Sequence, residues 1–447
     1  MFHRTIIENL KKWAKKPDRK PLVLRGARQV GKTTVVDMFS EEFDEYIYLN
    51  LEKPEHRRIF EDDYSFDDLL NRLFFHFGIE KNDASKTLIF IDEIQNSPKT
   101  IALLRYFYEN ANHLFVIAAG SLLENILDHN ISFPVGRVEY MFMHPCTFQE
   151  YLGAMGEKQS QKIYQGREIP AFAHDKLSQL FKNYATIGGM PGVLKTYSQN
   201  QDYTALESTY SGLITSYSED VEKYAKSSSL RQYIRHIIST AFTEAGARIT
   251  FDKFGNSPYR SREMKEAFTT LEKTMILKLV YPITSTKLPI QPDMKKKPRL
   301  HIFDTGLVNF SLRIFDELIS KKYLNEVYRG RIAEHIIGQE MSGTKFSLND
   351  SLEFWVRNKK GSGAEVDYIV SHKGLLIPIE VKAGASGKLR SLHQYVEAAP
   401  HDWAVRFYSG KMQIDDAKTI SGEKYKLINL PHYMAGRIND VLNEIIN

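Results

Sequence analysis

A short segment near the N-terminus constrains the fold of this chain more than any other feature. It follows the apolar residues 22–24, leads into a helical pattern, and reads Gly26, Ala27, Arg28, Gln29, Val30, Gly31, Lys32, Thr33 and Thr34. Gly26 and Gly31 permit a tight turn whose backbone N–H groups, with the start of the helix, form a cradle for an anion. In such a loop Lys32 reaches the β- and γ-phosphates of a nucleotide and the Thr33 hydroxyl binds Mg²⁺. We therefore expect a phosphate-binding loop at residues 26–34 rather than an ordinary strand-to-helix turn.

Length and composition exclude several classes of protein. The chain has 447 residues, more than one ordinary domain, and with 42% hydrophobic and 26% charged residues it is of the globular type. Cys146 is the only cysteine, which excludes an internal disulfide and a cysteine-cluster metal site. No apolar run is long enough for a membrane span and the first residues lack a signal-peptide core, so we expect a cytoplasmic protein. The net charge of +5 permits a nucleic-acid partner without arguing for one.

Two carboxylates follow the next strong strand signal. Residues 88–91 are apolar without interruption, which is typical of a strand buried on both faces, and Asp92 and Glu93 come directly after them. Downstream of a phosphate-binding loop, Asp92 is expected in the Mg²⁺ shell and Glu93 beside the attacking water.

Two further polar residues belong to the same predicted sheet. Ser121 follows the expected strand at residues 114–119, where it either senses the γ-phosphate or caps the next helix. Arg137 lies in a glycine turn before the apolar residues 140–143. It either acts as an arginine finger on a γ-phosphate, in this subunit or in a neighbouring one, or forms a surface salt bridge. If Arg137 acts on a neighbouring subunit, the protein must form an oligomer.

In this order the motifs resemble those of AAA+ ATPases. More specifically, the chain resembles a bacterial and archaeal group of AAA+ ATPases that carry a nuclease-like C-terminal domain of unassigned role. Residues 143–152 match that group's Pro-x-[Ser/Thr]-Phe-x-Glu-[Phe/Tyr]-Leu segment. The resemblance covers essentially the whole chain. It implies an α/β P-loop NTPase domain with a parallel sheet at residues 1–150 and a helical lid at residues 151–227. It also implies that Gly189 and Pro191 flank the adenine, although turn residues that merely break a helix remain the alternative.

The next segment, residues 228–315, has the pattern of a winged helix. Helical spacing at residues 230–238 and 261–275 is followed by two strand-like runs at residues 276–283 and 299–304, and three lysines lie between these runs at 295–297. On the second helix, Arg260, Arg262 and Lys265 are placed to meet DNA phosphates. A domain that serves only as a spacer remains equally open.

The C-terminal part, residues 316–447, carries a third constellation. Glu334 lies at a helix start, Asp367 in one strand, and Glu380 and Lys382 on the same face of the next strand because side chains alternate. Three carboxylates that converge suit Mg²⁺ or Mn²⁺, and Lys382 beside such an ion can orient or deprotonate a water. The ordered set resembles the signature of restriction-endonuclease-like nucleases, which implies an α/β domain of that type.

Two hypotheses follow from these patterns. In the first, an AAA+ ATPase hydrolyses MgATP with Lys32, Glu93 and Arg137 in catalysis, and couples hydrolysis to the winged helix and to a metal-dependent C-terminal domain acting on DNA through Lys382. In the second, the chain is a nucleotide-gated switch whose nuclease-like domain is inert and serves for docking.

Overall fold

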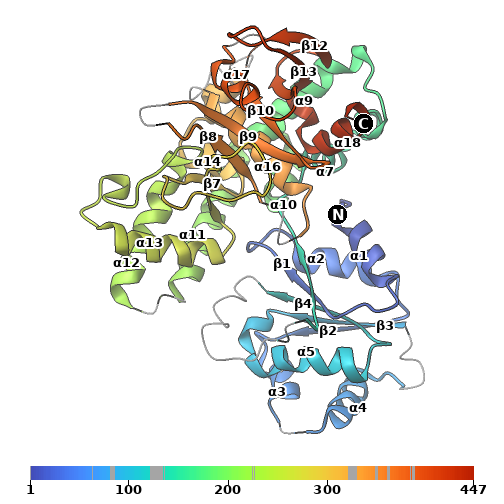
Figure 1. Ribbon diagram of the computed structural model, residues 1–447. Coiled ribbons are helices and arrows are strands. Elements are labelled where there is room, and N and C mark those ends of the chain that lie inside the picture. Colours follow the sequence, from blue (N-terminus) through green and yellow to red (C-terminus); the bar gives the residue numbers. More distant parts are fainter. Residues whose placement is uncertain are drawn as a thin grey trace.

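The computed structural model describes residues 2–62, 64–80, 86–120, 134, 136–223, 225, 227–320, 330–347, 351–359, 363–382, 384 and 388–446 (Figure 1). The N-terminal part forms an α/β sheet domain at the bottom of Figure 1, and the remainder of the chain lies above it. Among the described helices, none is long and apolar enough to cross a membrane.

The N-terminal domain is built on a five-stranded sheet in which every strand pair is parallel. The strands are β1 (Leu22–Arg25), β2 (Glu45–Asn50), β3 (Thr87–Asp92), β4 (Phe115–Gly120) and β5 (Glu139–Phe142). They lie in the order β2-β3-β4-β1-β5. The predicted parallel α/β sheet is therefore confirmed. Since the strands run in one direction, the loops that follow β1 and β3 meet at the same edge of the sheet.

Alternation along these strands creates two hydrophobic layers. On β3, Ile89 and Ile91 pack into one core, whereas Leu88 and Phe90 pack into the other. The helices that cover the two faces are α1 (Ile6–Ala14) and α2 (Lys32–Ser40) on the face toward the rest of the chain, and α3 (Pro54–Glu61), α4 (Phe66–Phe77) and α5 (Pro98–Asn110) on the far face (Figure 1). A short 3-10 helix, η2 (Ile94–Asn96), follows β3. Burial on both faces explains why β3 is an unbroken apolar run.

Helices follow the sheet and continue to the middle of the chain. They are α7 (Phe148–Ala154), α8 (Lys158–Gln165), η3 (Ala171–Ala173), α9 (His174–Ile187), α10 (Pro191–Asn200), η4 (Thr204–Leu206) and α11 (Glu207–Lys223). The next elements are α12 (Ser228–Thr240), η5 (Ala241–Glu244), η6 (Phe254–Asn256), α13 (Ser261–Lys273), β6 (Leu277–Val280), β7 (Arg299–Ile302), α14 (Thr305–Ser311) and α15 (Phe315–Ser320). β6 and β7 form an antiparallel pair, at the positions where the sequence predicts two strands.

The C-terminal part contains a mixed six-stranded sheet. Its elements are α16 (Arg331–Gly343), β8 (Glu353–Val356), β9 (Glu365–His372), β10 (Leu375–Val381), α17 (Arg390–Val396), β11 (Trp403–Tyr408), β12 (Gln413–Lys418), β13 (Lys424–Pro431), η9 (His432–Arg437) and α18 (Ile438–Ile445). The strand order is β12-β13-β11-β10-β9-β8. β10, β11 and β13 are parallel, whereas β8, β9 and β12 pair antiparallel with their neighbours.

The middle and C-terminal parts share one continuous hydrophobic core, which runs from Cys146 to Ile446. The loop between β6 and β7 is also attached to the C-terminal sheet, because Ile283 exchanges backbone hydrogen bonds with Phe354 and Val356 of β8. The predicted boundaries at residues 227 and 315 therefore do not separate independent cores. The segment predicted as the wing is anchored at its start, and its residues 287–289 and 291–297 are exposed or half-buried.

Candidate functional site

A cavity of about 770 Å³ lies at the sheet edge where β1 and β3 end. Its wall combines the phosphate-binding loop and start of α2, the end of β3, the end of α7, and one face of α10. The lining residues are Phe2, Arg4, Arg28, Gln29, Gly31, Lys32, Thr33, Thr34, Val35, Asp92, Glu93, Gly153, Ala154, Pro191, Gly192, Lys195, Ser198 and Gln199. The volume is in the range of pockets that bind small molecules and cofactors.

The loop itself has the backbone that such a cradle needs. Gly31 has φ +95° and Gln29 has φ +63°, so two residues of the loop are left-handed, and Gly31 has no Cβ to oppose this. A Cβ on Gly26 would lie 2.5 Å from the carbonyl oxygen of Met143 in the segment after β5. The sequence therefore requires glycine at 26 for close packing and at 31 for the turn.

Lys32 is buried and points back into the loop. Its Nζ donates to the carbonyl oxygens of Gly26 (2.9 Å) and Ala27 (3.0 Å). Burial lowers the pKa of Lys32, while the nearby carboxylates of Glu93 and Asp92 raise it. A cation in this position, held only by carbonyl dipoles inside the cavity wall, is matched to an anionic ligand.

The end of β3 supplies oxygen atoms next to the loop. The Thr33 hydroxyl donates to Asp92 Oδ2 (2.7 Å), and the Glu93 backbone N–H donates to Asp92 Oδ1 (3.0 Å). Burial raises the pKa of Asp92, and the hydrogen bond from Thr33 lowers it. Glu93 faces the cavity and has φ +53°, an unfavourable conformation for a side chain of this size. A hydroxyl and a carboxylate in contact are a donor pair that fits Mg²⁺.

The sequence motifs do not identify two cationic side chains of the cavity wall. Arg4 is buried and holds the loop from the N-terminal segment, because its Nη1 donates to the carbonyl oxygen of Val30 (2.8 Å) and its Nη2 to that of His144 (2.8 Å). Its Nε lies 3.1 Å from a carboxylate oxygen of Glu150. The other is Lys195, which is exposed on α10. No local pattern marks Arg4, whereas Lys195 is four residues after Pro191 and so shares its helix face.

The loop is tied directly to α11. Arg28 Nη1 forms an ion pair with Asp220 Oδ1 (2.5 Å), and the Tyr217 hydroxyl donates to the Arg28 carbonyl oxygen (3.1 Å). Gln29 Nε2 donates to Ser216 Oγ (3.2 Å). Consecutive loop residues thus contact one face of a helix almost 190 positions later in the sequence, and Arg28 also lines the cavity.

The sequence also predicts Ser121 and Arg137 near the γ-phosphate. Ser121 lies outside the described residues. Arg137 precedes β5, whose first residue pairs with the first residue of β1, so it lies at the opposite edge of the sheet from the loop. It forms an ion pair with Glu109 of α5. The structure therefore does not bring Arg137 to the cavity of its own chain, and an action on a neighbouring subunit stays a prediction.

Only one of the two residues predicted at the adenine faces the cavity. Pro191 lines it, but Gly189 is not among the lining residues. The Gly189 N–H donates to Asp304 Oδ2 (2.6 Å), its carbonyl oxygen accepts from the N–H of Cys146 (2.7 Å), and a Cβ there would lie 2.2 Å from the Cys146 carbonyl oxygen. Gly189 is therefore where three chain segments pack closely.

The C-terminal constellation also comes together. Lys382 Nζ donates to Glu380 Oε1 (2.5 Å), as the alternation along the strand predicts. Asp367 Oδ2 accepts from the N–H of Val381 (2.8 Å), and the Tyr368 hydroxyl donates to the carbonyl oxygen of Glu334 (2.8 Å). The sequence predicts this grouping from two neighbouring strands and a helix. In the structure these elements are β9, β10 and α16.

Burial and mutual repulsion disfavour the charged forms of the carboxylates in this group. Burial raises the pKa of Glu334 and of Glu380, and the Asp367 carboxylate raises both further. Arg299 of β7 and Lys382 act in the opposite direction. Within the part of the chain that the structure describes, no three His, Cys, Asp or Glu side chains are arranged to hold a metal ion. The metal site that the sequence predicts at Glu334, Asp367 and Glu380 therefore stays a prediction.

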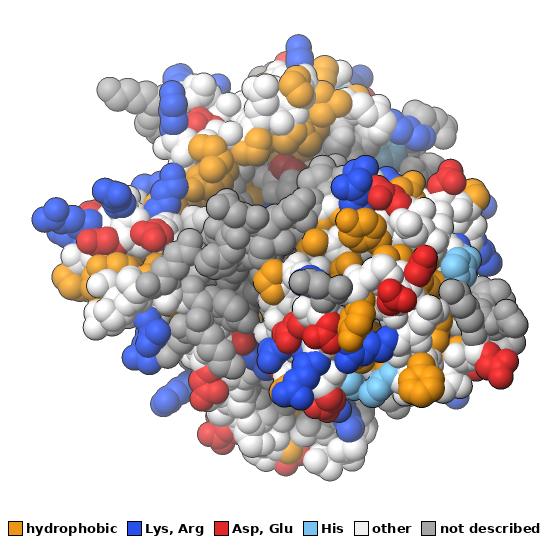
Figure 2. All heavy atoms as spheres, turned by 90° about the horizontal axis from the view of Figure 1, so that it is seen from below, with side chains coloured by type: hydrophobic (Ala, Val, Ile, Leu, Met, Phe, Trp, Pro, Cys, Tyr) orange, Lys and Arg blue, Asp and Glu red, His pale blue; other side chains and the backbone are white. Residues whose placement is uncertain are grey.

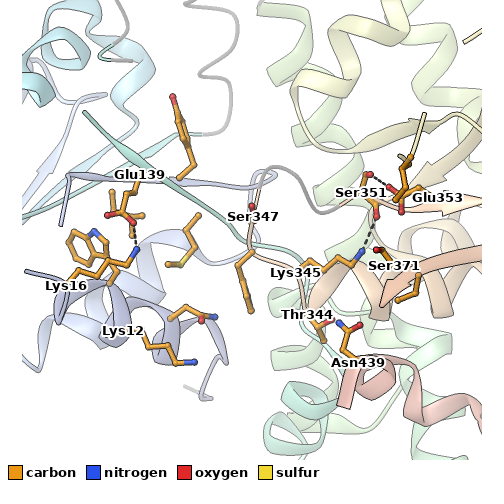
Figure 3. Close-up of a pocket in the computed structure, with 18 residues that line it drawn as sticks. Lys12, Lys16, Glu139, Thr344, Lys345, Ser347, Ser351, Glu353, Ser371 and Asn439 are labelled. Atoms are coloured by element: carbon orange, nitrogen blue, oxygen red, sulfur yellow. Dashed lines mark hydrogen bonds and ion pairs between the residues drawn. The ribbon is translucent and has the colours of Figure 1, made fainter. Parts of the chain in front are cut away.

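A second cavity, of about 600 Å³, lies between α1 and the C-terminal part (Figure 3). Lys16 forms an ion pair with Glu139 on one wall, and Lys345 Nζ donates to the Ser351 carbonyl oxygen on the other. None of the predicted site residues lines it. It is a space between the two halves of the molecule, beside the point where the N–H of Phe142 donates to the carbonyl oxygen of Phe346.

Solved structures with a similar arrangement include the Walker-type ATPase PABY2304 of Pyrococcus abyssi, with 15% identity and a TM-score of 0.45 over 70% of this chain and 96% of that one. The Aeropyrum pernix ORC1 protein in complex with DNA has 15% identity and a TM-score of 0.26 over 72% and 94%. PCH-2 of C. elegans has 10% identity and a TM-score of 0.26 over 44% and 62%. TM-scores this low carry no conclusion about the function of this chain.

Sequence families divide the chain into three. Residues 178–318 match one domain of unknown function (DUF8612) and residues 329–433 match another (DUF4143). No curated protein sequence matches the chain. The first family match, over residues 18–152, covers the sheet, the phosphate-binding loop and the carboxylates after β3. The family is described as an AAA domain, and residues 18–152 are similar to it.

Proposed function

We propose that the chain binds ATP in the cavity at residues 26–34 and hydrolyses it. One observation carries this proposal: the loop amides, the Lys32 ammonium, the Thr33–Asp92 pair and the Glu93 carboxylate all line the same 770 Å³ cavity, in the part of the chain that is similar to an AAA domain. Each has the chemistry that one part of a nucleoside triphosphate requires.

The roles follow from the contacts. Lys32 exchanges its two carbonyl partners for the β- and γ-phosphates, which are stronger acceptors. Thr33 and Asp92 hold Mg²⁺, which neutralises phosphate charge when bound. Glu93, the remaining carboxylate of the wall, orients and polarises the attacking water. Lys195 of α10 adds a further cation to the wall of the cavity.

The Arg28–Asp220 ion pair is the proposed connection between the nucleotide and the rest of the chain. Arg28 lines the cavity while it is bound to α11, so a triphosphate and Asp220 compete for the same guanidinium. Occupancy of the cavity therefore changes how α11 is held. This is what a nucleotide-gated switch needs.

For the C-terminal part we favour the second hypothesis, a domain that does not cleave in this arrangement. Glu380 is bonded to Lys382, Asp367 to the Val381 amide, and no metal-binding group is formed among the described residues. DNA is the proposed partner for the middle part, because Arg260, Arg262 and Lys265 are exposed around the start of α13. Lys and Arg side chains, mixed with acidic ones, also gather on the side of the molecule where α12 and α13 lie (Figures 1 and 2).

Phosphate release from ATP tests the first part. We expect Lys32→Ala to abolish ATP binding, and Glu93→Gln to retain binding while hydrolysis falls by about 10² to 10⁴-fold. Lys86→Ala is the matched control, because Lys86 is an exposed lysine at the start of β3, the opposite edge of the sheet. Equal ATP binding by the wild type and Lys32→Ala contradicts the proposal.

Plasmid nicking with Mg²⁺ or Mn²⁺, with and without ATP, tests the second part. We expect no nicking by the wild type, and the same result for Glu380→Ala and Lys382→Ala. Nicking by the wild type that both variants lose would restore the nuclease hypothesis. DNA binding is measured separately, by the salt dependence of the affinity of an Arg260→Ala/Arg262→Ala variant.

A further inference from the structure

Arg299 reaches from β7 of the middle part of the chain to β9, beside the acidic cluster of the C-terminal part. It is the first residue of β7, and its side chain is 6% exposed. Nη1 donates to the carbonyl oxygen of Asp367 (2.7 Å), and Nη2 forms an ion pair with the Glu365 carboxylate. The guanidinium also lies over the Phe354 ring, 4.4 Å from its centroid. This is a built site for one arginine, with ionic, backbone and aromatic contacts.

The cluster needs such a cation. Glu334, Asp367 and Glu380 are buried or half-buried carboxylates within range of one another, and unpaired charges of this kind are costly away from water. Lys382 is bonded to Glu380 on β10. Arg299 supplies the other positive charge, on the β9 side. Lys382 therefore pairs with one of the three carboxylates, and Arg299, which is paired with Glu365, adds positive charge beside them.

We propose that Arg299 is an internal lock: its charge beside the acidic cluster takes the place of a divalent cation and keeps such an ion out while β7 is seated. β7 and the loop before it are hydrogen-bonded to the C-terminal part. Ile302, at the other end of β7, donates its N–H to His335 Nε2 on α16 (3.3 Å), and the loop before β7 is bonded to β8. These bonds hold Arg299 beside the cluster. This inference does not depend on ATP hydrolysis.

Binding of Mn²⁺ to the full chain, followed by the electron paramagnetic resonance signal of free Mn²⁺, tests the lock without any activity assay. All proteins carry Asp92→Asn, so that the loop site contributes no binding. Arg299→Met keeps the apolar stem of the side chain and removes the charge. We expect it to bind one Mn²⁺ at least tenfold more tightly than the parent, and we expect Glu380→Gln to abolish this gain.

Arg248→Ala is the matched control. Arg248 also reaches Glu365 (3.4 Å) and also lies near the Phe354 ring (5.9 Å), but its side chain is 32% exposed. We expect its Mn²⁺ affinity to stay within twofold of the parent, because Arg299 stays in place.

If Arg299→Met does not fold, Glu365→Gln is the second test of the lock. It leaves Arg299 present but removes its ion pair, so the lock is loosened. We expect a gain in Mn²⁺ affinity smaller than that of Arg299→Met, although the variant has lost a negative charge. The proposal is overturned if the parent already binds Mn²⁺ through Glu380 as tightly as the folded variants, or if no folded variant gains affinity.

Discussion

Replacing Asp220 by asparagine tests how the phosphate-binding loop is coupled to α11. The Asp220 side chain is 13% exposed and forms the ion pair with Arg28. Its charge reaches the loop, since it raises the pKa of Lys32. The variant keeps the size of the side chain, removes one negative charge next to the cavity, and leaves Arg28 with a weaker partner.

The expected effect on ATP affinity follows from Coulomb's law. One unit charge at about 10 Å from a phosphate, at an effective dielectric constant of about 20, contributes about 1.7 kcal/mol before screening and on the order of 1 kcal/mol after it. We therefore expect Asp220→Asn to bind MgATP about 3 to 10-fold more tightly. The loss of a partly buried ion pair should lower the stability of the nucleotide-free protein by about 1–2 kcal/mol.

Titration with a fluorescent ATP analogue at low and high salt measures the affinity, and thermal unfolding measures the stability. Glu219→Gln is the control, because Glu219 is the preceding residue on the same helix, carries the same charge and is exposed. We expect its affinity to change by less than twofold. Folded Asp220→Asn that binds ATP no more tightly than the wild type, or more weakly, would falsify the competition between Asp220 and the triphosphate for Arg28.

Three other substitutions test single features. Gly189→Ala should lower the free energy of unfolding by about 2–4 kcal/mol, because its Cβ would lie 2.2 Å from the Cys146 carbonyl oxygen. Gly192→Ala is the control and should cost less than about 1 kcal/mol, because the nearest atom to a Cβ there is at 3.9 Å. Equal melting temperatures of the two variants would contradict the close packing at Gly189. Lys195→Ala should weaken ATP binding about 3 to 10-fold, and unchanged affinity would remove Lys195 from the site. Burial raises the pKa of Glu340 to about 7, so the folded state holds a proton that the unfolded state releases above its ordinary pKa of 4.5. Stability is therefore lost as pH rises from 4.5 through 7, by about 3 kcal/mol, and Glu340→Gln should melt with a smaller pH dependence between pH 5 and 8; identical pH profiles would refute this.

The sequence predicts those parts of the fold that depend on local pattern. The strands of the first sheet are readable because they are covered on both faces, which leaves apolar runs such as residues 88–91, and the loop because glycine is required at Gly26 and Gly31. Glu380 and Lys382 are found together because side chains two apart on a strand share a face.

The parts that escaped prediction depend on contacts between distant segments. Arg4 is an unremarkable residue of the N-terminal segment, yet it holds the loop by contacts to Val30 and His144. Arg299 reads as the first residue of a predicted wing strand, yet its partners lie more than 60 positions later. Burial of an arginine is decided by which segments pack around it, and neither hydrophobic period nor residue spacing encodes that.

One strand links the two sites. Arg299 begins β7 beside the acidic cluster, and only five positions later Asp304 accepts from the N–H of Gly189, two residues before Pro191 in the wall of the ATP cavity. Asp304 is fully buried and caps α14 by accepting from the N–H of Leu307 (3.0 Å), so this stretch cannot shift at one end without breaking bonds at the other. Adjacency alone is no proof of coupling. One hydrogen bond from Gly189 to Asp304, and five positions of chain from Asp304 back to Arg299, therefore join the wall of the ATP cavity to the strand beside the carboxylates.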